Sequence, residues 1–123
     1  MKRMALLALG LIVAQAVAAA APAHGETMVW KFRSHHPNIV DVQLYASARN
    51  NVWPGTGRVW SLEDYNVKSM TISCVAGERV CYGAWVRGTE SSYWGGGRNN
   101  RQRCQTCCYV CENRETPIIN LNR

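Results

Sequence analysis

The sequence lacks the short motifs of several common enzyme classes. It contains neither the H-E-x-x-H motif of zinc proteases nor the G-x-S-x-G elbow of serine hydrolases. The glycines at 95–97 are not followed by Gly-Lys-Ser/Thr, so they do not form a P-loop. Glu63 and Asp64 are adjacent, and neighbouring side chains on an extended strand point apart. A non-catalytic protein is therefore favoured, with a small envelope enzyme as an alternative whose site assembles only in space.

Acidic residues are also few. The 123 residues contain 14 Lys plus Arg against 8 Asp plus Glu, which gives a formal net charge of +6. A chain of this length forms one small domain, and no internal repeat or long linker divides it. The first 23 residues carry two of the cations, so the remaining charge of +4 is modest. Nucleic acid is therefore not an expected partner.

Long hydrophobic runs are absent after the N-terminus. Two cations at positions 2 and 3 precede an apolar run over residues 5–21, and small residues crowd its end. This pattern predicts a secretory signal peptide over residues 1–23, with Ala-x-Ala cleavage releasing a domain at 24–123. Cleavage after Ala18 or Ala20 and an uncleaved membrane anchor are the alternatives. The expected location is periplasmic or secreted, with membrane contact only through the signal peptide.

Helical periodicity is scarce after residue 23, whereas alternation with a period of two recurs. We expect strands at residues 30–33, 40–46, 70–74, 80–86 and 118–121. The run at 80–86 is apolar on both faces and predicts a central, fully buried strand. Turn residues at 36–38 and 77–78 predict hairpins. The expected fold class is all-β, a small antiparallel β-sandwich or barrel stabilised by disulfides.

The six cysteines are the strongest structural signal. They are Cys74, Cys81, Cys104, Cys107, Cys108 and Cys111, and the last four occupy eight residues. Export favours disulfides among all six, because small exported domains depend on such crosslinks. Cys74 and Cys81 flank the turn at 77–78 symmetrically, so they pair with each other or each reaches the C-terminal cluster. A zinc centre on the four clustered thiolates is the alternative to disulfides.

Tryptophan is abundant, with five residues in the chain. Trp30 and Trp85 fall on apolar strand faces and are expected in the core. Other aromatics and a group of arginines lie beside turns, where they can anchor a ligand. The candidate binding residues are Trp53, Trp60, Tyr93, Trp94, Arg98, Arg101 and Arg103.

Three segments together resemble a group of small, secreted, cysteine-rich bacterial proteins. They are residues 74–85 (CVAGERVCYGAW), residues 93–97 (YWGGG) and residues 104–111 (CQTCCYVC). The resemblance covers roughly the last half of the expected domain. It implies export and disulfides, and it implies no substrate, cofactor or catalytic residue.

These patterns predict an exported, non-catalytic binding module that contacts an envelope glycan or a protein partner through loop aromatics and arginines. No cofactor and no metal are expected. A zinc-binding domain and a small envelope enzyme are the alternative functions.

Overall fold

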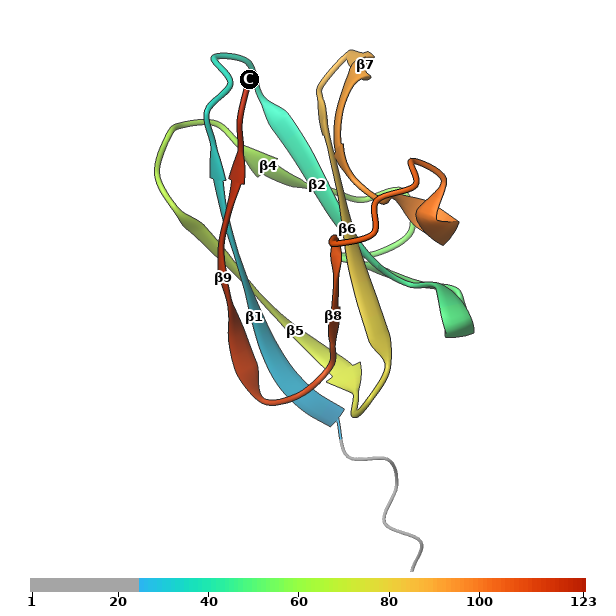
Figure 1. Ribbon diagram of the computed structural model, residues 1–123. Coiled ribbons are helices and arrows are strands. Elements are labelled where there is room, and N and C mark those ends of the chain that lie inside the picture. The colour runs from blue at the N-terminus through green and yellow to red at the C-terminus, as the bar shows by residue number, and fades with distance from the viewer. Residues whose placement is uncertain (1–24) are drawn as a thin grey trace, which may run out of the picture.

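The computed structural model describes residues 25–123, which form two facing β-sheets (Figure 1). The predicted signal peptide at 1–23 lies outside the described residues. Within them the strands are β1 (Gly25–Ser34), β2 (Val40–Ala46), β3 (Asn51–Trp53), β4 (Trp60–Leu62), β5 (Lys68–Val75), β6 (Arg79–Val86), β7 (Thr89–Gly95), β8 (Cys108–Val110) and β9 (Arg114–Leu121). Two single-turn 3-10 helices, η1 (Ser47–Arg49) and η2 (Arg98–Asn100), complete the elements of this region. Over residues 25–123, no helix has the length and apolar character needed to cross a bilayer.

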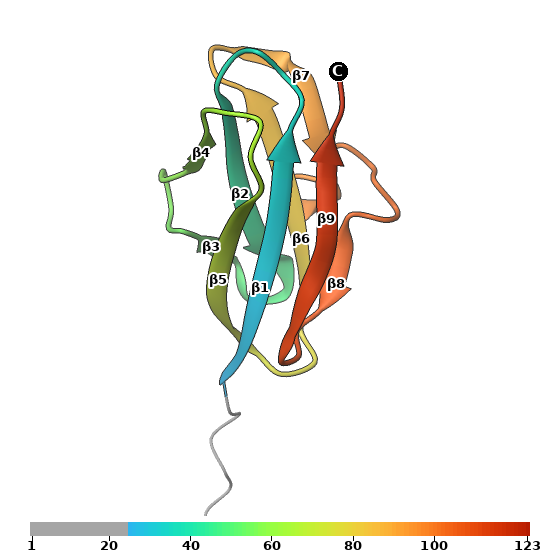
Figure 2. The ribbon, with the colours of Figure 1, turned by 90° about the vertical axis from the view of Figure 1, so that its left-hand side faces the viewer.

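The first sheet has three strands in the order β5-β1-β9. β1 runs antiparallel to β5 and parallel to β9, as Figure 2 shows with β1 in the middle. Its alternating sequence places Met28, Trp30 and Phe32 on the inner face, where each is fully buried. The side chains between them face outward, as the period of a strand requires.

The second sheet is built on β2 and β6, which pair antiparallel at its centre. β3 and β4 pair with different parts of β2, and β7 and β8 pair with β6. The predicted central position of residues 80–86 is confirmed, since β6 has strands on both sides. The prediction that this strand is fully buried is wrong, because Tyr82 and Trp85 are only half-buried. Val80 and Ala84 face the core and are fully buried.

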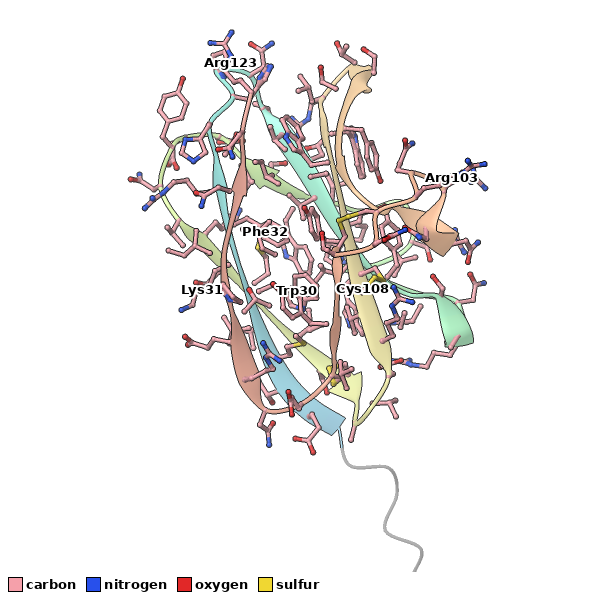
Figure 3. The ribbon with its side chains drawn as sticks, in the orientation of Figure 1. Trp30, Lys31, Phe32, Arg103, Cys108 and Arg123 are labelled. Carbon is pink, nitrogen blue, oxygen red and sulfur yellow. A yellow bond between two sulfur atoms is a disulfide. The ribbon has the colours of Figure 1, made fainter. Side chains whose placement is uncertain are left out.

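Aromatic rings fill the space between the sheets. Trp30 stacks on Phe32 with ring centroids 6.0 Å apart and meets Tyr109 edge-on at 5.3 Å (Figure 3). Tyr82 from β6 packs edge-on against Phe32 at 5.4 Å. Large side chains from both sheets therefore share one interior. The predicted all-β fold stabilised by disulfides is confirmed.

The two predicted hairpins are wrong. The segment 36–38 joins β1 to β2, and Gly77–Glu78 joins β5 to β6, so each connects strands of different sheets. A tight turn does form, one residue earlier than predicted: the Glu78 N–H donates to the Val75 carbonyl at 3.0 Å, so residues 76 and 77 occupy its two central positions. The strands diverge beyond it because each buries its apolar face against the core from the opposite side.

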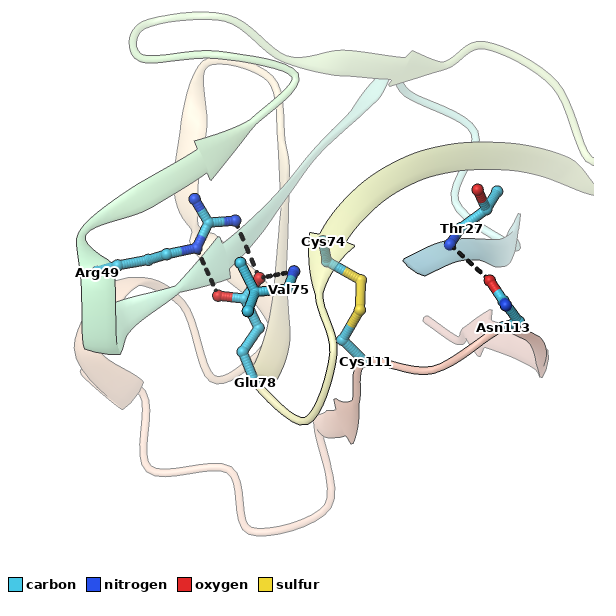
Figure 4. The surroundings of a disulfide bond; sticks show 7 residues. All are labelled: Thr27, Arg49, Cys74, Val75, Glu78, Cys111 and Asn113. Carbon is cyan, nitrogen blue, oxygen red and sulfur yellow. Dashed lines mark hydrogen bonds and ion pairs between the residues drawn. A yellow bond between two sulfur atoms is a disulfide. The ribbon is translucent and has the colours of Figure 1, made fainter. Parts of the chain in front are cut away.

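All six cysteines form disulfides, as expected, and no thiolate is left for a zinc centre. The pairs are Cys74–Cys111, Cys81–Cys108 and Cys104–Cys107. Cys74 and Cys81 each reach the C-terminal cluster, the second of the two alternatives left open by the sequence. Cys74 is buried on the inner face of β5, so its bond to Cys111 links that strand to the segment that follows β8 (Figure 4).

Candidate binding cleft

A cleft of about 390 Å³ lies on the outer face of the second sheet. Three of the seven predicted binding residues line it, namely Tyr93, Arg98 and Arg101. Its other lining residues are Tyr45, Trp85, Gly97 and Gln102. The cleft therefore combines aromatic side chains from three strands with polar side chains from the loop around η2.

Three predicted binding residues lie elsewhere because they face the interior. Trp53, Trp60 and Trp94 belong to β3, β4 and β7, and all three pack against the core cluster while remaining partly exposed. The indole N–H of Trp94 donates to the Asn122 carbonyl at 2.8 Å. Trp94 follows Tyr93 on one strand, and alternation sends the two side chains to opposite faces. The seven residues therefore do not form one continuous surface.

The seventh predicted residue, Arg103, is exposed and does not line the cleft (Figure 3). It lies at the end of the segment 96–103, which we call the arginine loop. Arg103 has a positive φ of 54°, which is uncommon for a residue with a long side chain. Its place in the same loop makes it a matched control for the two arginines that do line the cleft.

The aromatic side of the cleft is formed by a cross-strand pair. Trp85 on β6 lies opposite Tyr93 on β7. Their rings are stacked, with centroids 6.0 Å apart and planes 10° from parallel. Both side chains are half-buried, so part of each ring remains open to solvent.

Glycines make room for Tyr93 in this arrangement. A Cβ on Gly83 or on Gly97 would overlap the Tyr93 hydroxyl group. Gly97 also has a positive φ of 69°, which few other residues adopt easily. The ring of Tyr93 therefore crosses β6 at the one point where that strand carries no side chain on its outer face.

Tyr45 forms the base of the cleft. It is 4% exposed, and its hydroxyl donates to Gln43 Oε1 at 2.8 Å. Burial, reinforced by the neighbouring Tyr93, raises the pKa of Tyr45 well above its usual value of 10. Its phenol is therefore neutral at physiological pH, and it places no negative charge beside the arginines.

The arginine loop is held by backbone hydrogen bonds to β6. The N–H groups of Gly96 and Gly97 both donate to the Tyr82 carbonyl, at 2.9 and 3.2 Å. The Gln102 N–H donates to the Gly96 carbonyl at 2.9 Å, and this bond closes the loop. Asn99 and Asn100 both adopt positive φ values, which asparagine tolerates better than most residues. These bonds fix where the loop carries its cations.

The positive charge of the cleft is not neutralised within the described residues. The Arg98 guanidinium donates to the neutral Asn50 side chain. Among the side chains that the structure describes, no carboxylate forms an ion pair with Arg98 or Arg101, and none lines the cleft. By contrast, Arg87 pairs with Asp41 at 2.8 Å and Arg49 pairs with Glu78 at 2.7 Å. An anionic ligand would supply the missing partner.

Sequence reasoning missed Trp85, Tyr45 and Gln102. The expectation that Trp85 belongs to the core is wrong, because it faces outward while Val80, Ala84 and Val86 face inward. The sequence contained a signal for the outward position of Trp85. Alternate residues of a strand share a face, which places Trp85 with Gly83 and not with those three residues. The same parity rule places Tyr45 on the outer face of β2, between inward Leu44 and Ala46.

Comparison of the chain with protein-family models, with curated proteins and with solved structures gives no match. The cleft is therefore interpreted from its own chemistry.

Proposed function

We propose that the protein is an exported binding module that holds an anionic ligand in the cleft on its second sheet. The observation that carries this proposal is the presence in one cleft of the stacked Trp85–Tyr93 pair and two arginines that have no carboxylate partner among the side chains that the structure describes. A guanidinium group presents N–H donors in a planar fork that matches carboxylate and phosphate groups. Aromatic rings beside such donors add apolar contact area.

The size of the cleft supports a small ligand or one end of a polymer. Its volume of about 390 Å³ lies near the lower end of the range of small-molecule sites. A concave site with a few convergent polar groups favours such a ligand over a flat protein patch. An acidic group of an envelope polymer fits this description.

Export is part of the proposal, and two features support it. Disulfides form and persist in oxidising compartments, and this small domain has three of them. The N-terminal sequence also has the charge and hydrophobicity of a signal peptide. Both features support a periplasmic or secreted location.

The proposal is tested with the double variant Arg98→Gln/Arg101→Gln. We expect the unsubstituted protein to be retained on immobilised polygalacturonate or on polyphosphate at low salt, with disulfides intact. The double variant removes both cleft charges, so its retention should fall at least tenfold. The measurement is the apparent Kd from a concentration series, with circular dichroism as the check on folding.

The control is Arg103→Gln with a second charge change at another residue that does not line the cleft, Arg58→Gln. These substitutions remove the same charge from outside the cleft and should alter retention less than threefold. If both double variants lose binding equally, net charge alone is responsible and the cleft is not the site. Retention on neither polymer would also overturn the proposal.

A further inference from the structure

The two sides of the cleft differ in chemistry in a way that narrows the ligand class. One side is the nearly parallel Trp85–Tyr93 pair, and the other carries the cations of the arginine loop. We infer that the ligand is a carboxylated sugar, whose ring packs on the aromatic side and whose carboxylate binds Arg98 and Arg101. This inference rests on the proposed function and names the ligand of the same site.

The aromatic side favours a saturated ring with C–H groups on its faces. The face of an aromatic ring is electron-rich, so it attracts the weakly positive hydrogens of such a ring. Trp85 and Tyr93 stack nearly parallel and are half-buried, so the exposed part of the pair is already held in place before a ligand binds. A bare inorganic anion would leave this surface without a contact.

The charged side favours a carboxylate. The side chain of Arg98 is already oriented by its hydrogen bond to Asn50, which leaves other guanidinium N–H groups for a ligand. Arg101 adds a second guanidinium on the same cleft. A neutral sugar would dock beside these cations without supplying their missing charge, so we expect it to bind more weakly.

The remaining polar group suits sugar hydroxyls. The Gln102 side chain carries both a donor and an acceptor, and each hydroxyl of a sugar can also act as either. The cleft volume of about 390 Å³ accommodates a short stretch of saccharide rather than a folded domain. A chain of uronic acids combines the ring, the carboxylate and the hydroxyls in every unit.

The test compares four probes by titration calorimetry on the disulfide-intact protein. They are trigalacturonate, the neutral trigalactose of the same linkage, inorganic tripolyphosphate and a triglutamate peptide. We expect trigalacturonate to bind at least tenfold more tightly than each of the other three. The neutral sugar lacks the charge, and the two other anions lack the ring.

A second arm uses Trp85→Leu, which keeps an apolar side chain but removes the aromatic face. We expect it to weaken trigalacturonate binding at least fivefold and to leave any tripolyphosphate binding within twofold. The matched control is Tyr65→Leu, because Tyr65 is 59% exposed and lies outside the cleft. Near-UV circular dichroism checks that each variant keeps its fold.

Three results would overturn the inference. If tripolyphosphate or triglutamate binds as tightly as trigalacturonate and depends on Arg98 and Arg101, the cleft is a general anion site and only the proposed function stands. Equal binding of trigalactose would show that the charge does not select the ligand. If none of the probes binds, both the inference and the proposed function are wrong.

Discussion

At the scale of single residues, the cleft depends on a glycine in the middle of a strand. Gly83 lies at the centre of β6, where most residues would place a side chain on the outer face. The Tyr93 hydroxyl occupies that space, and Tyr45 approaches it from the other side. Glycine makes the strand less stable than another residue would. It also leaves the space that fixes Tyr93 on the aromatic side of the cleft.

We expect Gly83→Ala to destabilise the protein by about 1–3 kcal/mol, because its methyl group overlaps the Tyr93 hydroxyl. Adding Tyr93→Phe removes that hydroxyl, so the double variant should recover part of the loss. Urea unfolding of the four members of this cycle measures the coupling. Gly55→Ala is the control, because its Cβ meets only the flexible Arg58 side chain. Equal losses for Gly83→Ala and Gly55→Ala would contradict the packing argument.

At the scale of elements, a carboxylate ties the turn between the two sheets to η1. Glu78 accepts from the Val75 N–H at 2.6 Å and from Arg49 at 2.7 and 2.9 Å (Figure 4). Burial alone would raise the pKa of Glu78, but these hydrogen bonds outweigh it and hold the pKa below its usual value of 4.5. The ionised form therefore stabilises the turn.

The lowered pKa of Glu78 makes stability depend on pH. The unfolded chain binds the proton more readily, so the contribution is complete above about pH 4.5 and is lost as pH falls through the lower pKa of the folded state. We expect Glu78→Gln to flatten this part of the profile and to lower stability at pH 7. Urea unfolding between pH 2.5 and pH 7 provides the measurement, because this interval extends about two pH units to either side of the usual carboxyl pKa. An unchanged profile in Glu78→Gln would contradict this role of the carboxylate.

The elements also show how far the sequence predicts the fold. Alternation located the core-facing positions of β1, β2 and β5, because burial on one face imposes a period of two on any strand. It did not reveal partners, since a turn such as 77–78 looks the same whether its strands pair or separate into two sheets. The parallel pairing of β9 with β1 has no local signal at all.

The candidate site was predictable to a similar extent. Glycines followed by arginines indicated the arginine loop, and Arg98 and Arg101 do line the cleft. Trp53 and Trp60 were assigned to loops because turn residues adjoin them, yet short strands carry them against the core. Trp85 was assigned to the core because β6 is apolar on both faces, and hydrophobicity alone does not say which face is inner.

At the scale of the whole molecule, the disulfides concentrate on the segment 104–111. Chain entropy predicts that their contributions follow the loops they close. The bonds Cys74–Cys111, Cys81–Cys108 and Cys104–Cys107 have sequence separations of 37, 27 and 3 residues. These separations correspond to contributions of about 4, 3.5 and 1.5 kcal/mol to the free energy of unfolding. The first two together are comparable with the net stability of a domain of this size.

We therefore expect reduction of all three bonds to unfold the domain, seen as loss of near-UV circular dichroism. Replacing the pair Cys104 and Cys107 by alanine should lower the free energy of unfolding least and leave the near-UV circular dichroism unchanged. Replacing Cys74 and Cys111 should cost most, since that bond is buried and closes the longest loop. Unchanged near-UV dichroism in excess reductant would show that the core holds without its crosslinks.

The place of β9 has a consequence for when the chain can fold. The ribosome synthesises β1 well before β9, yet the two strands lie side by side in the first sheet (Figure 2). Cys74 likewise cannot form its disulfide until Cys111 has been synthesised, shortly before β9. Neither half of the nascent polypeptide can reach its final form ahead of the other. Such an order of synthesis leaves the first sheet incomplete until β9 has emerged.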